Sequence, residues 1–290
     1  MTCYPTLRLE CDGMESLIID DAAGMYVSAI DLGNAVTRAV VQDAVDADGT
    51  DDSTVYTGAR NVTLQLSIFP DVDTETLWTL RQRLRSFTSP RLRPVLFIQQ
   101  SEDAPEQRIV LRRSDYTDVL AASNSDWARI TVQWVAPSGI IESAVVHPVQ
   151  VFAATGDGAG RTYDLTYPRT YPPSAALGTA TIVNSGNADA YPLLRIYGPL
   201  TEPEITSYTQ DKSLVFAGIT LVADEFLEID TRAKTIYLNG DPSANRYSML
   251  VFPESQWFTL SPGANQIRFH PATFVEAVSL VEFTFRDAWL

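Results

Sequence analysis

The chain has 290 residues, of which 45% are hydrophobic and 20% are charged, and this composition is that of a globular protein. Its 36 acidic and 21 basic residues give a formal charge of −15, which repels nucleic acid phosphates and argues against sequence-specific nucleic acid binding. No stretch approaches the roughly 20 apolar residues of a membrane helix, so we expect no membrane insertion. The N-terminus lacks the basic and apolar regions of a signal peptide, so we expect synthesis in the cytosol.

The cysteines and histidines provide no metal framework. Cys3 and Cys11 lie on either side of a predicted strand, and either a disulfide or two free thiols fit this spacing. A reducing cytosol favours the free thiols. His147 and His270 are the two histidines of the sequence and no CxxC pair occurs, so we predict neither a metal site nor a cofactor.

Short strands dominate the first 70 residues. Three β-type runs, at 5–10, 15–20 and 25–32, are separated by Asp-Gly and Ala-Gly turn signals. A further strand is predicted over 62–69, where apolar and polar residues alternate strictly. We expect its apolar face to be buried; that face carries Val62, Leu64, Leu66 and Ile68.

An acidic loop over 43–52 precedes this strand. It contains Asp43, Asp46, Asp48, Gly49, Asp51 and Asp52. Calcium binding is one reading of these carboxylates, but the glycine is misplaced for an EF-hand and no glutamate follows at the required distance. We therefore interpret the segment as a solvated loop.

The apolar period changes to that of an amphipathic helix over 73–88. Its apolar residues recur at spacings of three and four: Leu77, Leu80, Leu84 and Phe87. Asp73 or Thr74 is expected to cap the helix, and Glu75 suits the positive end of its dipole. The later turns carry Arg81, Arg83 and Arg85. An anion site is one reading of these arginines; we favour a solvated helix face that pairs with a neighbouring subunit.

Three more strands complete the first domain, at 94–100, 107–113 and 127–136. One helix on a mostly antiparallel sheet predicts an α+β, split-barrel-like domain over 1–150. Residues 151–177 are rich in Gly, Pro, Thr and Tyr without periodicity, and predict an extended connector. We expect its tyrosines to lie against a domain surface, although disorder is the alternative.

The region 178–290 predicts a β-sandwich of about nine short strands, of the jelly-roll or lectin-like class. The predicted strands include 179–184, 193–198, 213–218, 225–230, 233–239, 257–260, 265–270 and 279–286. Asn239-Gly240 and Ser261-Pro262-Gly263 are strong turn signals, and no helical period interrupts the strands.

The sequence contains no recognisable catalytic constellation. His147 and His270 each precede a proline, and there is no G-x-S-x-G elbow to supply a nucleophile. The glycine-rich residues 156–160 lack the strand-to-helix context of a phosphate loop. One interpretation that stays open is a pair of carboxylates for glycoside hydrolysis, drawn from Asp224, Glu225, Glu228 and Asp230. Because these alternate with apolar residues, we interpret them as the outer face of a sandwich strand and predict no enzyme.

A linked set of motifs occupies the C-terminal region. The first comprises Asn184, Gly186, Pro192, Ile196, Gly198, Pro199, Pro203 and Ile205. EFLEIDTRAKTIYLNGD follows over 225–241, and SQWFTLSPGANQIRF over 255–269. The residues themselves indicate fold-building roles: Gly198-Pro199 ends a strand, while Trp257, Phe258 and Leu260 fill the core. Together with GARNVTLQLSIF at 58–69, the acidic loop and the single helix, these motifs resemble the distal tail protein family of siphophages over nearly the whole chain.

This resemblance implies a mainly β protein with an N-terminal ring-forming domain and a C-terminal galectin-like β-sandwich. It implies a structural virion protein at the tail tip or baseplate. A homohexameric ring would join the tail tube protein to the baseplate hub or tail fibre and surround the DNA exit channel. The C-terminal domain would hold receptor-binding proteins or touch host glycan. We expect the helix 73–88 and the acidic loop 43–52 at ring or tube contacts, and the acidic excess suits a channel wall.

Two other functions compete with this one. A carbohydrate-binding protein would use exposed aromatic rings of the sandwich: Tyr191, Tyr197, Tyr208, Tyr237 and Trp257. A galectin-type site also needs clustered His, Asn and Arg, and His270 is the single histidine of that region. A tail-fibre-associated hydrolase would need acid–base residues that the sequence does not display.

Overall fold

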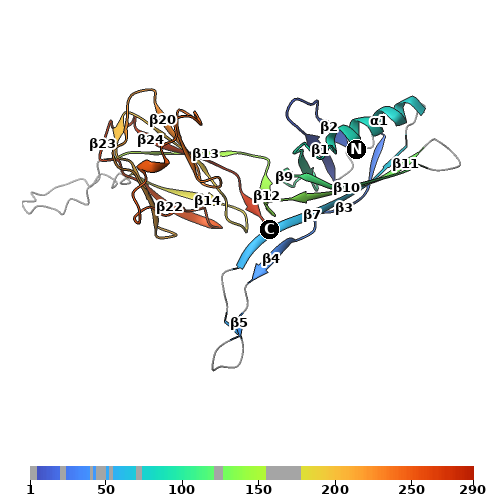
Figure 1. Ribbon diagram of the computed structural model, residues 1–290, viewed down its shortest axis with the longest axis horizontal. Coiled ribbons are helices and arrows are strands. Elements are labelled where there is room, and N and C mark those ends of the chain that lie inside the picture. Colours follow the sequence, from blue (N-terminus) through green and yellow to red (C-terminus); the bar gives the residue numbers. More distant parts are fainter. Residues whose placement is uncertain are drawn as a thin grey trace, which may run out of the picture. The chain divides into compact units, whose positions relative to one another are not determined.

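The computed structural model describes residues 5–19, 24–39, 42–43, 50–51, 55–69, 74–120, 127–154 and 178–290 (Figure 1). The described residues form antiparallel sheets and one α-helix, so the prediction of a mainly β protein is confirmed. The chain divides into two compact units: Met1–Ala144 with Trp289–Leu290, and Val145–Ala288. The predicted boundary at residue 150 falls within a strand, His147–Phe152, that pairs in the second unit. Most of the predicted connector, 155–177, lies outside the described residues.

Two antiparallel sheets build the first unit. One has the order β2-β1-β8-β9-β12-β25. Its strands are β1 (Thr6–Glu10), β2 (Leu17–Ile19), β8 (Val95–Gln99), β9 (Gln107–Val110), β12 (Ile141–Ser143) and β25 (Ala288–Trp289). The other has the order β10-β11-β7-β3, with β4 also paired to β7. Its strands are β3 (Met25–Asp31), β4 (Ala35–Ala39), β7 (Val55–Ile68), β10 (Arg112–Leu120) and β11 (Ala128–Ala136).

The core of the first unit contains the inward faces of both sheets and one face of helix α1 (Thr74–Phe87). Alternation along β7 is as predicted, since Val62, Leu64, Leu66 and Ile68 are all buried. The predicted helix is also confirmed: Leu77, Leu84 and Phe87 are buried, and Leu80 packs partly against the same core. Asp73 and the side chains of Thr74 and Glu75 lie outside the described residues, so the predicted cap stays a prediction.

The strand predicted over 107–113 is wrong in one respect. The structure divides it into β9 and β10, which belong to different sheets. Leu111 lies between them, fully buried, and its backbone N–H donates to the carbonyl of Pro94 at 2.9 Å. The chain therefore passes from one sheet to the other at this residue, a change of partner that local strand propensity does not reveal.

The second unit consists of three antiparallel sheets in the described residues. A five-stranded sheet has the order β13-β24-β15-β20-β21, a four-stranded sheet β14-β22-β17-β18, and a three-stranded sheet β19-β16-β23. The first contains β13 (His147–Phe152), β15 (Leu193–Tyr197), β20 (Phe226–Asp230), β21 (Thr235–Leu238) and β24 (Leu280–Phe285). The second contains β14 (Thr179–Asn184), β17 (Glu204–Ser207), β18 (Lys212–Val215) and β22 (Gly263–Phe269). The third contains β16 (Leu200–Thr201), β19 (Thr220–Leu221) and β23 (Thr273–Phe274).

Alternate residues of the two larger sheets are buried, as a β-sandwich requires. The galectin-like detail of this sandwich stays a prediction. The strand predicted at 257–260 is wrong: this segment is irregular, with a single bridge between Leu260 and Ala190. The sequence expectation also placed Trp257 in the core, whereas Phe258 and Leu260 are buried and Trp257 is only partly so.

Candidate functional site

A hairpin arm extends from the sheets of the first unit (Figure 1). It consists of β4 paired with the first half of β7, and it carries a short outer pair, β5 (Gln42–Asp43) with β6 (Thr50–Asp51). The predicted acidic loop is thus partly paired, because Asp43 opposes Thr50 and Gln42 opposes Asp51. Residues 44–49 and 52–54 lie outside the described residues, so the calcium reading is not tested there.

The root of the arm is held by Arg60. Its side chain is 2% exposed; Nε donates to the carbonyl of Gly139 at 3.1 Å and Nη1 to the carbonyl of Gly33 at 3.3 Å. Burial lowers the pKa of Arg60 because the charged guanidinium is desolvated. A side chain at Gly139 would lie 2.1 Å from the carbonyl oxygen of Gly58, so glycine permits this close approach to β7.

The arginines of α1 do not converge on an anion site in the described residues. Arg83 is engaged within its own unit, 3.1 Å from the Glu15 carboxylate and donating to the carbonyl of Ser16 at 3.1 Å. Arg85 is exposed, with its guanidinium carbon 5.9 Å from the ring centroid of Tyr116. On the outer face of the helix Trp78 is 60% exposed, which is unusual for so large an apolar side chain.

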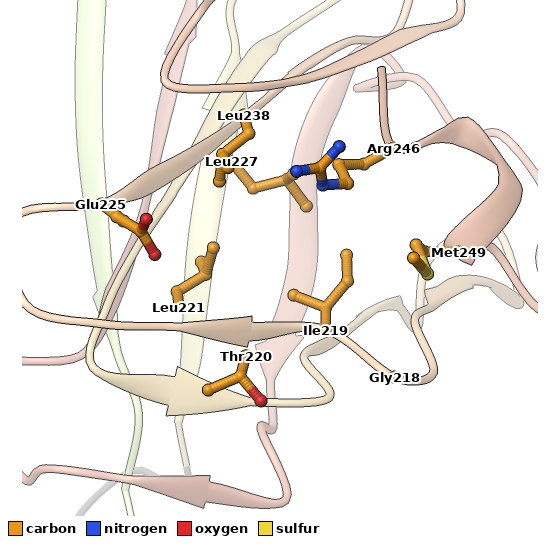
Figure 2. Close-up of a pocket in the computed structure, with 9 residues that line it drawn as sticks. All are labelled: Gly218, Ile219, Thr220, Leu221, Glu225, Leu227, Leu238, Arg246 and Met249. Atoms are coloured by element: carbon orange, nitrogen blue, oxygen red, sulfur yellow. The ribbon is translucent and has the colours of Figure 1, made fainter. Parts of the chain in front are cut away.

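A pocket of about 270 Å³ opens in the second unit (Figure 2). It is lined by Gly218, Ile219, Thr220, Leu221, Glu225, Leu227, Leu238, Arg246 and Met249. Figure 2 shows Glu225 and Arg246 on opposite sides, with aliphatic side chains between them. Glu225 accepts a hydrogen bond from the backbone N–H of Val222 at 3.0 Å, so this carboxylate holds its own turn.

Few of the side chains that line this pocket are of the types used in catalysis. Its described lining offers the hydroxyl of Thr220, one carboxylate and one guanidinium, and neither histidine of the chain contributes to it. The nucleophile, base and orienting group of a hydrolytic site are therefore not assembled there. Elsewhere in the described residues, no group of three or more His, Cys, Asp and Glu side chains is close enough to hold a metal ion.

The residues considered for acid–base chemistry have separate structural contacts. His147 Nε2 lies 3.4 Å from Asp287 Oδ2, and the backbone N–H of His270 donates to the carbonyl of Glu204. Glu228 projects from β20 and binds Arg195 across the sheet, as expected for an outer strand face. Asp230 accepts backbone N–H groups in the turn that follows, at 2.8 Å. Cys11 is a free thiol packed against the core, and Cys3 lies outside the described residues.

The aromatic residues considered for sugar binding are dispersed, with one exception. Tyr191 is 41% exposed and carries a guanidinium over its ring; Tyr208 is 50% exposed on a different segment. Tyr197 and Tyr237 are partly buried. Trp257 is the exception, because it lies in a group of rings whose other members, Tyr247 and Phe252, the sequence reasoning missed.

We call Tyr247, Phe252 and Trp257 the aromatic platform. The ring centroids of Tyr247 and Phe252 are 6.2 Å apart with planes inclined by 32°. Those of Tyr247 and Trp257 are 6.3 Å apart with planes inclined by 24°. Phe252 is 56% exposed and Tyr247 38% exposed. Two exposed rings and the partly buried ring of Trp257 lie close together and form a distinct surface feature.

Several residues of the family motifs make close structural contacts within the second unit. Asn184 is buried; its amide donates to the carbonyls of Ala188 and Leu260 at 2.8 and 3.0 Å. Gly186 passes so close to Ala288 that an added Cβ would lie 1.8 Å from that carbonyl oxygen. The hydroxyl of Thr231 donates to the carbonyl of Pro192 at 2.7 Å and joins two of the motifs.

Comparison with known proteins shows one family and several solved structures that this chain resembles. Residues 185–289 match the family model of the siphovirus-type tail component, C-terminal domain. The fold resembles the crystal structure of the phage SPP1 Dit (gp 19.1) protein, described as a paradigm of hub adsorption apparatus in Gram-positive infecting phages. That likeness has a TM-score of 0.64 at 13% identity and covers 98% of this chain and 99% of the other. No curated protein sequence matches the chain.

Baseplate structures show the same likeness at lower similarity. The phage P2 baseplate in its activated conformation with Ca matches with a TM-score of 0.52 and 10% identity. The phage p2 baseplate in its activated conformation with Sr matches with a TM-score of 0.51 and 11% identity. Each match covers 98% of both chains.

The chain therefore resembles siphovirus-type tail components in the sequence of residues 185–289, and phage distal tail and baseplate proteins in its fold. The predicted resemblance to the distal tail protein family is confirmed, by the family model over the C-terminal region and by the fold over nearly the whole chain. A helix long and apolar enough for a membrane span does not occur in the part of the chain that the structure describes.

Proposed function

We propose that this chain forms a closed ring at the tail tip, and that the ring joins the tail tube protein to the baseplate hub or tail fibre around the DNA exit channel. The hairpin arm is the observation that carries the proposal. A two-stranded hairpin is marginally stable alone in water, and the arm extends beyond the sheets to which its root is fixed. Contact with a neighbouring copy would stabilise the arm.

The chemistry of β4 supports a contact between copies. Val36 projects from β4 and is 54% exposed, and within the described residues β4 pairs with β7 alone. Its second edge therefore has backbone groups available for a partner. An arm from one copy that reaches a different surface on the next makes a heterologous interface, which closes into a ring when the rotation permits. The homohexamer is the closed form that the family resemblance implies.

Two further features fit the proposal. Trp78 on α1 has the size and exposure of a binding hot spot, which supports this helix as a contact with the tube or with a neighbouring copy. The formal charge of −15 disfavours adhesion of DNA to the walls of a channel. We propose that the protein acts by assembly and not by catalysis, with the second unit available to receptor-binding proteins or host glycan.

The ring is tested by mass photometry and negative-stain electron microscopy of the purified chain. We expect closed rings of the wild type and monomers of Val36→Asp, because the carboxylate would be buried in the contact. Val183→Asp is the matched control, since Val183 is 55% exposed on β14 of the second unit. A wild-type chain that stays monomeric at every concentration and with tube protein supplied would contradict the proposal. So would equal effects of the two substitutions.

A further inference from the structure

The ring assigns no role to the aromatic platform, of which only Trp257 lies in a family motif, at 255–269. The inference below deepens the proposed availability of the second unit to host glycan and rests on that part of the proposed function. We propose that the aromatic platform binds a chain of neutral hexopyranose sugars, with the rings of Tyr247, Phe252 and Trp257 beneath successive sugar faces. The site lies within one copy of the chain, so the proposal does not rest on ring formation.

Ring geometry gives the first argument. Neighbouring ring centroids are 6.2 and 6.3 Å apart, with planes inclined by 32° and 24°, and Phe252 and Tyr247 are 56% and 38% exposed to solvent. An aromatic face carries the negative part of the ring quadrupole. The axial C–H bonds of a pyranose form an apolar, slightly positive face of about the same size, so the two surfaces are complementary in shape and charge.

Rigidity of the supporting segment gives the second argument. The backbone N–H of Tyr247 donates to Asn245 Oδ1 at 2.7 Å, at the start of the 3-10 turn η2 (Tyr247–Met249). Ser255, which is buried, exchanges two hydrogen bonds with Val215 of β18, each of 3.0 Å. Next to it, the backbone N–H of Gln256 donates to Ser213 at 2.7 Å. The rings are thus presented on a fixed segment, which lowers the entropy cost of binding a flexible chain.

The polar surroundings select the ligand class. Ser248, Glu254 and Gln256 are exposed on the same segment and can bond to hydroxyl groups. Residues 241–257 contain two carboxylates, Asp241 and Glu254, against the guanidinium of Arg246. This balance disfavours phosphates and anionic sugars, and therefore single-stranded nucleic acid, which also stacks on aromatic rings. A neutral, hydroxyl-rich ligand fits; a proline-rich peptide is the competing occupant.

NMR of the indole N–H of Trp257, assigned with Trp257→Phe, tests the site directly. The probes are hexasaccharides of α-1,4-linked glucose, β-1,4-linked glucose and β-1,4-linked N-acetylglucosamine, together with decaproline and a thymidine decanucleotide. We expect a saturable shift with at least one hexasaccharide, with a dissociation constant of about 1 mM or tighter. The same shift is expected in the Val36→Asp variant, so failure of the ring and failure of this site are distinguishable.

Phe252→Ala is the decisive variant, because Phe252 is exposed and its loss leaves the core intact. It should weaken hexasaccharide binding by about fivefold to tenfold, as expected for one lost stacking contact. Tyr208→Ala, an exposed aromatic of the same unit outside the platform, should leave binding within about twofold. The proposal is overturned by no shift with any hexasaccharide, by saturation with decaproline or the oligonucleotide instead, or by equal losses in the two variants.

Discussion

Arg60 Nε donates to the carbonyl oxygen of Gly139 across 3.1 Å, and this bond joins the arm to a turn 79 residues further along the chain. A second bond from the same guanidinium reaches Gly33, on the approach to β4. Nη2 is buried and has no hydrogen-bond partner among the described residues. The buried guanidinium of Arg60 therefore holds the root of the arm in place, although its removal from water is unfavourable.

Arg60→Ala should loosen the root of the arm. The substitution leaves the buried carbonyl of Gly139 and the partly buried carbonyl of Gly33 without their donor and opens a void, so we expect a loss of about 2 kcal/mol in the stability of the first unit. Hydrogen exchange should accelerate in Ala35–Ala39 and in the first half of β7, and thermal unfolding should begin earlier. Arg112→Ala, at an exposed position on β10, should change stability by less than about 0.5 kcal/mol. Indistinguishable exchange in the two variants would refute this role for Arg60.

Gly186→Ala should disrupt the second unit. The new Cβ would lie 1.8 Å from the carbonyl oxygen of Ala288, a backbone atom that cannot move without breaking the bond from the N–H of Ala188. We expect a loss of more than about 3 kcal/mol, measured by urea unfolding. Gly263→Ala separates crowding from backbone strain, because Gly263 has φ +88 with nothing within 4 Å. Its cost should be about 1–2 kcal/mol, from the left-handed backbone alone. A cost for Gly186→Ala no larger than this would show that the close approach is relieved easily.

Local sequence pattern predicted the regular parts of this fold. Strict alternation at Val62–Ile68 and the three–four spacing from Leu77 to Phe87 each report one buried face, and both faces are buried as expected. Where the structure depends on pairing between strands that are distant in the sequence, the local pattern did not predict it. Leu111 divides one apparent strand between two sheets, and residues 257–260 have strand-like composition without a partner strand.

The aromatic platform was hidden from the sequence for a related reason. Trp257 was considered both for the core and for the surface, and its partner Tyr247 lies ten residues away in an irregular segment. No period links positions 247, 252 and 257 on a strand or helix, so their proximity depends on the turns between them. A cluster of aromatic residues within a stretch that has strong turn signals was the one indication available.

The pair of Arg195 and Glu228 should contribute little stability despite good geometry. The two side chains oppose each other on β15 and β20, with Arg195 Nη2 2.9 Å from Glu228 Oε2. The hydrogen bond with Glu228 raises the pKa of Arg195. The arginine side chain is 40% exposed, however, so solvent screens the attraction. A double-mutant cycle with Arg195→Met and Glu228→Gln should give a coupling below about 1 kcal/mol that falls with added salt. A larger, salt-independent coupling would contradict this assignment.

Asp241 should show a pH dependence that Ser243 controls. Its Oδ1 accepts the hydroxyl of Ser243 at 2.7 Å and the backbone N–H of Ser243 at 2.8 Å, and these bonds lower the pKa of Asp241. Because the folded pKa is lower than the unfolded one, the carboxylate supports its turn above the unfolded pKa and loses that role as the pH falls through the folded pKa. A carbon-13 titration over about pH 2 to 6 measures this directly. Ser243→Ala should raise the pKa of Asp241 toward its ordinary value, since the hydroxyl provides the larger effect. Ser248→Ala, an exposed serine of the next turn, is the control; an unchanged pKa of Asp241 in Ser243→Ala would show that the hydroxyl has no such effect.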